Sequence, residues 1–286
     1  MIKKISVVGG DLRIVKLIQM LANDGFEINT YALEKIDNIE MVKKCKTIEE
    51  AIEDTQIVIG PIPISSDNVY INTPFSDKKV TLDELSLKSK GKKIIAGSIK
   101  PEMYQLNMNN EIETIDILDR EELAVLNAIS TSEGAIQIAM DETKRTIHDS
   151  NILILGFGKT GKILAKMLDG IGANVHCQAR EKVDLAWIKA YGYHPIHQNE
   201  LDKELSKYDI IMNTVPTMML DQEKLKQVKS DCVIIDLASN PGGVDRNAAK
   251  QLGIKMIWAL SLPGKVAPVT CAEFIKDTIY NIFTEI

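Results

Sequence analysis

Residues 151–165 read NILILGFGKTGKILA, in which a short apolar run is followed by three glycines and then by an amphipathic segment. This pattern predicts a buried strand, a G-x-G-x-x-G turn and a helix. Gly156 permits the tight turn, Gly158 lets the backbone approach a pyrophosphate, and Gly161 permits close packing of the helix on the strand. The first N–H groups of the helix are left unpaired and attract phosphate. Because Asn174–Gln178 reads as the next strand, the stretch predicts a dinucleotide-binding Rossmann domain over residues 148–265.

The end of that next strand indicates which dinucleotide is bound. An acidic residue there bonds the ribose hydroxyl of NAD, whereas an arginine accommodates the 2′-phosphate of NADP. The chain has Gln178-Ala179-Arg180 at this place, with Glu181 directly after it. We therefore expect Arg180 to bind the phosphate of NADP, with NAD as the alternative cofactor and a plain surface cation as the alternative role of Arg180.

Loops after the later strands are expected to line the rest of the cofactor site, because ligands of doubly wound sheets bind at the carboxyl ends of the strands. Three segments qualify: Asn213–Pro216, Asp236–Gly243 and Leu262–Pro268. The residues predicted to bind the cofactor are Gly156, Gly158, Lys159, Thr160, Gly161, Arg180, Thr214, Val215, Pro216, Ala238 and Pro263.

Short β-branched runs alternate with helical patterns along the whole chain, which predicts an α/β fold of two domains with a cleft between them. An N-terminal flavodoxin-like or Rossmann-like domain is expected over residues 1–120. Its strands are predicted at Ile5–Val8, Glu27–Tyr31, Ile57–Ile59, Ile94–Ala96 and Ile115–Leu118, with helices at Leu12–Asn23 and Thr47–Glu53. Residues 60–80 contain three prolines and read as a long functional loop.

The second domain repeats the alternation. Its strands are predicted at Ile152–Leu155, Asn174–Gln178, Ile210–Asn213, Val233–Asp236 and Met256–Trp258. A connector helix is expected over residues 121–147, capped by Asp119 with Glu122 and interrupted at residues 130–134. A final helix, Thr270–Ile286, is expected to begin with a capping box of Thr270 and Glu273 and to pack back on the first domain.

Composition excludes several classes of function. Of the 286 residues, 45% are hydrophobic and 26% charged, so a sizeable core is expected, and the net charge of −6 argues against nucleic acid as a partner. No apolar run reaches the length of a membrane span or resembles a signal peptide, so a cytoplasmic protein is expected.

Metal and hydrolase chemistry are also not expected. The four cysteines, which form no C-x-x-C pair, are expected to be reduced, and the four histidines lack the spacing of metal ligands. The segment His194–His197 reads as a connection between elements. No G-x-S-x-G elbow is present.

Six blocks of the chain together resemble the dipicolinate synthase A family, over nearly the full length. They are Val8–Arg13, Gly60–Ser65, Leu126–Ala135, Gly156–Gly161, Asp236–Gly243 and Leu262–Pro268. The last two are also similar to blocks of alanine dehydrogenase, where the pattern has an acid in place of Asn240.

The resemblance implies an activity, a cofactor and a partner. It implies NADP-dependent dehydrogenation of dihydrodipicolinate, or of its hydroxylated tetrahydro precursor, to dipicolinate in the mother cell of a sporulating bacterium. It further implies a flavoprotein-like partner, the B subunit of dipicolinate synthase, and the chain is compatible with a homo-oligomer.

A substrate with two carboxylates calls for cations and neutral donors. We expect Arg13, which follows the first strand, to hold one carboxylate while Asp11 caps the next helix. A surface pair of Arg13 with Asp11 or with a glutamate is the alternative. Lys265 is expected to reach the other carboxylate. Glu133 is the predicted base, with a role at the helix dipole as its alternative. The neutral donors are predicted to be Ser65, Ser66, Thr131 and Ser132.

Two other functions remain open from the sequence. One is a related two-domain dehydrogenase that acts on an amino acid or hydroxy acid. The other is a redox sensor that binds the dinucleotide without turning it over and signals through a partner; such a sensor would need no dicarboxylate pocket.

Overall fold

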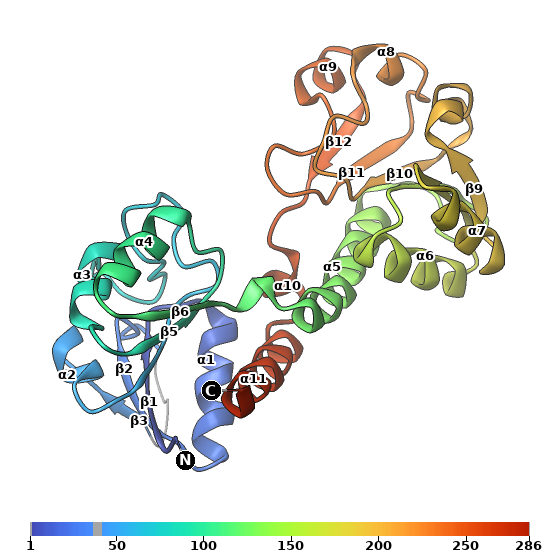
Figure 1. The fold of residues 1–286 in the computed structure, drawn as a ribbon. Coiled ribbons are helices and arrows are strands. Elements are labelled where there is room, and N and C mark those ends of the chain that lie inside the picture. The colour runs from blue at the N-terminus through green and yellow to red at the C-terminus, as the bar shows by residue number, and fades with distance from the viewer. Residues whose placement is uncertain (1, 37–41, 286) are drawn as a thin grey trace. The chain divides into compact units, whose positions relative to one another are not determined.

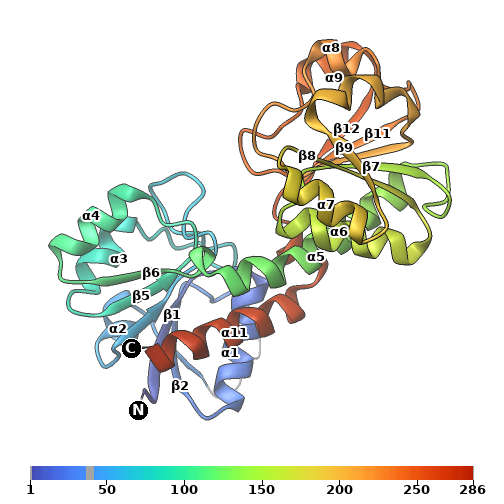
Figure 2. The ribbon, with the colours of Figure 1, turned by 45° about the vertical axis from the view of Figure 1, so that its right-hand side comes forward.

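The computed structural model describes residues 2–36 and 42–285, which form two compact units. Unit 1 comprises residues up to Leu126 together with Ala267–Ile286, and unit 2 comprises Asn127–Val266. Each unit is a parallel sheet with helices on both faces (Figures 1 and 2). The α/β architecture predicted from the alternation of strands and helices is therefore confirmed.

Unit 1 has six strands in the order β3-β2-β1-β4-β5-β6. They are β1 (Lys4–Val8), β2 (Glu27–Tyr31), β3 (Val42–Lys44), β4 (Ile57–Ile59), β5 (Lys93–Ala96) and β6 (Glu113–Asp116). Its helices are α1 (Leu12–Asn23), α2 (Ile48–Ile52), α3 (Leu82–Lys88), α4 (Pro101–Asn109), the 3-10 turn η1 (Ile117–Asp119) and α11 (Pro268–Glu285). The strand expected at residues 115–118 ends earlier, because Asp116 accepts the Leu118 N–H and starts the 3-10 turn.

Unit 2 has the same topology, with its six strands in the order β12-β11-β10-β7-β8-β9. They are β7 (Asn151–Leu155), β8 (Asn174–Ala179), β9 (His194–His197), β10 (Ile210–Asn213), β11 (Val233–Asp236) and β12 (Lys255–Trp258). Its helices are α6 (Lys159–Ile171), α7 (Lys182–Ala190), α8 (Gln222–Leu225), α9 (Arg246–Gln251), α10 (Leu262–Val266) and the 3-10 turns η2 (Gln198–Lys203) and η3 (Leu205–Lys207). The expected connection at residues 194–197 is instead the edge strand β9.

The helix α5 (Glu121–Glu142) runs without a break through the boundary between the units. The predicted interruption at residues 130–134 is wrong, as is the predicted extension to Ile147. The Thr131 hydroxyl donates to the Asn127 carbonyl (2.8 Å) and the Ser132 hydroxyl to the Ala128 carbonyl (2.7 Å), so neither caps a new helix. Hydroxyl groups that bond the preceding turn are tolerated inside a helix.

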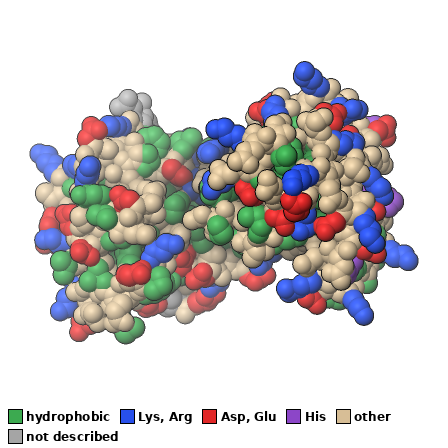
Figure 3. Space-filling view, turned by 90° about the horizontal axis from the view of Figure 1, so that it is seen from above, with side chains coloured by type: hydrophobic (Ala, Val, Ile, Leu, Met, Phe, Trp, Pro, Cys, Tyr) green, Lys and Arg blue, Asp and Glu red, His purple; other side chains and the backbone are tan. Residues whose placement is uncertain are grey.

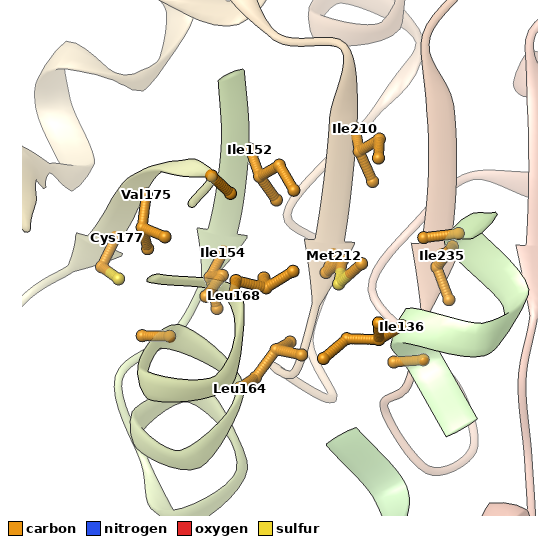
Figure 4. Packing of buried hydrophobic residues seen from close by; sticks show 14 of the residues in the cluster. Ile136, Ile152, Ile154, Leu164, Leu168, Val175, Cys177, Ile210, Met212 and Ile235 are labelled. Carbon is orange, nitrogen blue, oxygen red and sulfur yellow. The ribbon is translucent and has the colours of Figure 1, made fainter. Parts of the chain in front are cut away.

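The strands of unit 2 are apolar on both faces, as expected for a parallel sheet covered by helices. On one face, Ile154 and Met212 pack against Leu164 and Leu168 of α6 and Ile136 of α5 (Figure 4). The alternate strand residues face a second cluster beneath η3, α8 and α9. This double cover holds the carboxyl ends of the strands in fixed positions.

The C-terminal helix α11 belongs to the core of unit 1. Ile275 and Ile279 of α11 are buried in one cluster with Leu17 and Ile18 of α1. The helix begins at Pro268, so the predicted start at Thr270 with its capping box is wrong; proline suits the first turn, where no N–H partner is needed.

Replacing Ile279 by Ala should lower the free energy of unfolding by about 2–5 kcal/mol, because a fully buried side chain is removed from the contact with α1. Urea-induced unfolding measures this, and Val269→Ala, at a position 46% exposed on the same helix, should change stability by less than about 0.5 kcal/mol. Equal effects of the two substitutions would show that α11 contributes nothing to the core.

Candidate functional site

Unit 2 contains a cavity of about 670 Å³ at the carboxyl ends of its strands. It lies where the strand order reverses between β7 and β10, which is the position of ligand sites in doubly wound sheets. The lining residues are Gly156, Phe157, Gly158, Lys162, Gln178, Ala179, Arg180, Glu181, Asp184, Gln198, Thr214, Val215, Pro216, Thr217, Met218 and Met219.

The three glycines of the turn between β7 and α6 have separate tasks. A Cβ on Gly161 would lie 2.2 Å from the Gly156 carbonyl oxygen, so only glycine allows α6 to approach the turn this closely. Gly156 has a φ of +93°, which favours glycine. A Cβ on Gly158 would meet no atom within 4 Å, and Gly158 caps α6 without a side-chain bond. The open N-terminus of α6 therefore fits a pyrophosphate.

The loop after β10 is fixed by a buried polar pair. The Asn213 amide donates to the Asp236 carboxylate (2.7 Å) and to the Val215 carbonyl (3.0 Å), while Asp236 also accepts the N–H groups of Ala238 (3.1 Å) and Gly243 (2.8 Å). Asp236 is 1% exposed and all these groups are paired. The pair joins the ends of β10 and β11 and holds one wall of the cavity rigid.

The glycine pair after β11 is explained by this packing. A Cβ on Gly243 would lie 2.4 Å from the Asn213 amide nitrogen and 2.5 Å from the Val215 carbonyl oxygen. A Cβ on Gly242 would lie 2.8 Å from the Asp236 carboxylate. Both glycines therefore serve close packing of the backbone behind the cavity wall.

At the end of β8 the cavity has a mixed charge. Gln178 is buried, whereas the Arg180 side chain is 79% exposed and its Nε donates to the Glu181 carboxylate (2.9 Å). Asp184, in the first turn of α7, lines the same part of the cavity. Arg180 thus follows the strand end that contacts the ribose in dinucleotide-binding sheets, and its guanidinium is paired with Glu181.

Two titratable side chains of β8 lie in the sheet and are neutral near pH 7. Burial lowers the pKa of His176 to about 4, and the neighbouring His194 contributes to the same shift. Burial raises the pKa of the Cys177 thiol to about 12. Neither group therefore offers a charge to a ligand.

Six of the residues predicted to bind the cofactor line the cavity: Gly156, Gly158, Arg180, Thr214, Val215 and Pro216. The Thr214 hydroxyl already donates to the Leu155 carbonyl (2.8 Å). The remaining predictions, Lys159, Thr160, Gly161, Ala238 and Pro263, are not among its lining residues.

Sequence reasoning missed several residues of the cavity, among them Lys162, Asp184 and Gln198. Lys162 lies one turn into α6, and its Nζ is 5.6 Å from the centre of the Phe157 ring. The helical periodicity after Gly158 could have pointed to Lys162. No signal identified Gln198, because it follows the unpredicted strand β9.

Unit 1 has a smaller cavity, about 310 Å³, at the corresponding reversal of strand order between β1 and β4. It is lined by Asp11, Pro61, Ile62, Pro63, Asn72, Thr73 and Pro74. Here the loop of residues 60–80 packs on the glycine turn: the Gly10 N–H donates to the Asn72 carbonyl (3.0 Å), and a Cβ on Gly9 would lie 2.9 Å from the same oxygen. This contact occupies the place that a pyrophosphate takes in a dinucleotide-binding unit.

Arg13 lies behind this cavity and is 8% exposed. Its guanidinium donates to both carboxylate oxygens of Asp11 (2.8–3.1 Å) and to the Ile62 carbonyl. Asp11 also caps α1, as predicted, by accepting the Arg13 N–H (3.0 Å). The expectation that Arg13 stays free beside the capping aspartate is wrong: the alternative pair with Asp11 is present, with the Arg13 side chain 10% exposed and the Asp11 side chain 39% exposed.

The other predicted substrate residues are placed as follows. The Ser66 hydroxyl donates to the Asn72 amide oxygen (2.8 Å), and Ser65 bonds Asp67 (3.1 Å), so both serve the loop itself. The exposed Lys265 donates to the Leu260 carbonyl (3.0 Å). Glu133 lies in a different hollow of unit 2, with Ile136, Gln137, Met140, Asp141, Met167 and Ile171.

The surface charge is mixed, with basic and acidic side chains interspersed over the face seen in Figure 3. Within residues 2–36 and 42–285 no cluster of three or more His, Cys, Asp or Glu is placed to hold a metal. None of the helices described is long and apolar enough to span a membrane.

A glycine turn, an open helix N-terminus and a cavity at the reversal of strand order together define a dinucleotide-binding unit. The similarity of the chain to known protein families supports this class of protein. Residues 120–249 match the family described as D-isomer specific 2-hydroxyacid dehydrogenase, NAD binding domain, and residues 4–118 match the family of N-terminal domains of the dipicolinate synthase A subunit.

The similarity to single proteins extends over the whole chain. The A subunit of dipicolinate synthase from Bacillus subtilis (strain 168) is 32% identical over 99% of this chain and 96% of its own length. The crystal structure of the same subunit from Bacillus halodurans has a TM-score of 0.89 at 28% identity, covering 98% of this chain and 97% of that one. The chain belongs to the family of dipicolinate synthase A subunits and is an oxidoreductase.

A likeness to another dehydrogenase concerns the fold alone. A structure of L-alanine dehydrogenase has a TM-score of 0.69 at 14% identity, covering 98% of this chain and 88% of that chain.

Gly158→Ala should weaken nicotinamide dinucleotide binding about tenfold or more while the protein stays folded, because the added methyl enters only the open space above the N-terminus of α6. Fluorescence titration with the dinucleotide checks this. Gly170→Ala on the same helix also meets no atom within 4 Å and should leave the affinity unchanged. Unaltered affinity in Gly158→Ala would show that the pyrophosphate does not bind at this turn.

Proposed function

We propose that the protein is the dehydrogenase component of a dipicolinate synthase, which oxidises dihydrodipicolinate to dipicolinate with NADP. If the substrate is the hydroxylated tetrahydro precursor, one water is lost in addition to the hydride and the proton. The observation that carries the proposal is that the family match includes residues 4–118. This range lies in unit 1, outside the cofactor cavity, so the similarity covers more than a widely shared dinucleotide-binding unit.

The residues of unit 2 fit a nicotinamide dinucleotide. The N-terminus of α6 would bind the pyrophosphate, and the loop after β10 would position the ribose on the nicotinamide side. The bound cofactor would supply the hydride acceptor. The dihydro ring becomes aromatic by losing one hydride and one proton, so the chain needs mainly to bind and orient this ring.

The dicarboxylate substrate requires positive or hydrogen-bonding partners. We propose that Lys265 binds one carboxylate. Its side chain is exposed, and a water molecule can replace the hydrogen bond that it donates to the Leu260 carbonyl. We also propose as donors the hydroxyls of Thr131, Ser132, Ser65 and Ser66, which would have to exchange bonds within their own segments for the substrate. Glu133 remains a proposed base whose surroundings in unit 2 are largely apolar.

The partner and the setting are part of the same proposal. The relatives are named as A subunits of a synthase, so we propose that this chain acts with a separately encoded, flavoprotein-like B subunit. A sporulating bacterium, and the cytoplasm of its mother cell, would be the setting of this activity.

Incubating the protein with NADP, the B subunit and the enzymes that form dihydrodipicolinate should yield dipicolinate and NADPH in equal amounts. Absorbance of each product measures the reaction, and Gly158→Ala is the control with a damaged cofactor site. Binding of NADP without formation of NADPH, with the B subunit present, would favour a sensor over an enzyme.

Cofactor preference gives a second test. We propose that Arg180 exchanges Glu181 for the 2′-phosphate of NADP, a charge-assisted contact. Arg180→Ala should then weaken NADP binding about tenfold and leave NAD binding nearly unchanged, as measured by calorimetric titration of both dinucleotides.

Glu181→Gln is the matched variant in this test. It frees the guanidinium of Arg180 and removes a negative charge from the cavity, so it should strengthen NADP binding. Equal affinity of the wild-type protein for NAD and NADP would contradict the assignment.

A further inference from the structure

The cavity of unit 1 is rich in acceptors and poor in donors. Three of its seven lining residues are prolines, which have no backbone N–H. Its side-chain donors are partly engaged: one N–H of the Asn72 amide donates to the Pro63 carbonyl (2.8 Å), and the Thr73 hydroxyl donates to the Lys78 carbonyl (3.0 Å). The cavity therefore offers little to a carboxylate.

Asp11 is the charged residue among those that line this cavity, and its side chain is 39% exposed. Its position is fixed from behind by Arg13, whose side chain is 10% exposed, and by the first turn of α1. Because Arg13 in turn donates to the Ile62 carbonyl, the guanidinium is anchored to the opposite loop. Each carboxylate oxygen has lone pairs beyond these bonds, so Asp11 can accept a further donor.

We propose that this cavity binds the hydrogen-bond-donating edge of the substrate, and that Asp11 accepts an O–H or N–H of the substrate ring. Arg13 is then a positioning residue that holds the Asp11 carboxylate, instead of a direct partner of a substrate carboxylate. The inference rests on the proposed function, since it takes the ligand to be a ring dicarboxylate.

Three planar ligands distinguish the effect of a hydrogen-bond donor on affinity from the effects of ligand size and charge. They are 4-hydroxypyridine-2,6-dicarboxylate, which has a ring O–H or N–H donor in either tautomer, its 4-methoxy analogue, which has none, and pyridine-2,6-dicarboxylate. Calorimetric titration of the protein saturated with NADP should show the hydroxy compound binding about tenfold or more tightly than the other two, because a hydrogen bond to a charged acceptor is a strong one.

The preference for the hydroxy compound should fall in Asp11→Asn and disappear in Asp11→Ser. Both replacements keep a residue that caps helices, so α1 should remain folded, which thermal unfolding verifies. Asp77→Asn is the control for loss of one negative charge, because Asp77 is 90% exposed in the same loop and pairs with Lys35. It should leave all three affinities unchanged.

Arg13→Met distinguishes positioning from direct contact. If Arg13 only holds Asp11, the substitution should reduce the preference for the hydroxy compound and leave the affinity for pyridine-2,6-dicarboxylate unchanged. An equal loss of affinity for all three ligands would mean that Arg13 binds a carboxylate directly, which overturns the inference.

The remaining outcomes separate the inference from the proposed function. If the wild-type protein binds the three ligands equally, or Asp11→Ser keeps the preference, the inference fails while a dicarboxylate site stands. If none of the ligands binds to the wild-type protein with NADP present, the dicarboxylate substrate itself is wrong, and the inference is overturned with it.

Discussion

The approach of α6 to the end of β7 is the constraint on which the cofactor site depends. Gly161 touches the Gly156 carbonyl so closely that a single methyl group has no room. This contact brings the first N–H groups of α6 to the floor of the cavity, where the neighbouring turn is open above Gly158. The Asn213–Asp236 pair then fixes the opposite wall, so both sides of the site are held before a ligand binds.

Two units with the same topology have been adapted to different purposes. In both, the strand order reverses beside the first strand, and in both a glycine turn leads from that strand into a helix. In unit 2 the turn is left open. In unit 1 the backbone of Asn72 packs against Gly9 and Gly10, and a proline-rich wall with one carboxylate replaces the phosphate site. The long loop thus covers a turn in unit 1 whose counterpart in unit 2 is open.

Sequence reasoning was most successful where one short-range pattern determines the structure. The strand before Gly156, the helix after Gly158 and the cap at Asp11 follow from local rules and are present. Predictions from the sequence failed where packing between distant parts of the chain determines the local structure. The strand β9 has few apolar residues and contains Pro195, which an edge strand tolerates, so it had no strand signal. Thr131 and Ser132 are typical capping residues, yet the burial of Ala135 and Ile136 in the core of unit 2 keeps the helix continuous.

The site shows the same division. Gly156, Gly158 and Gly161 could be predicted because the G-x-G-x-x-G spacing itself indicates a turn that leads from a strand into a helix. The expectation of a free Arg13 side chain was wrong because the Ile62 carbonyl, 49 residues away in the chain, engages the guanidinium together with Asp11. No spacing rule could have supplied that partner, since it depends on the path of the loop after β4.

The place of α11 in unit 1 has a consequence for the order in which the protein acquires its structure during synthesis. The helix α11 supplies Ile275 and Ile279 to a core whose members outside this helix lie between Ile5 and Leu123 in the chain. Unit 2 is continuous in the chain, from Asn127 to Val266, so all of its core residues are made before α11. The apolar face beside α1 can therefore be buried only after α11 has been made, whereas unit 2 has all of its core residues earlier in the chain.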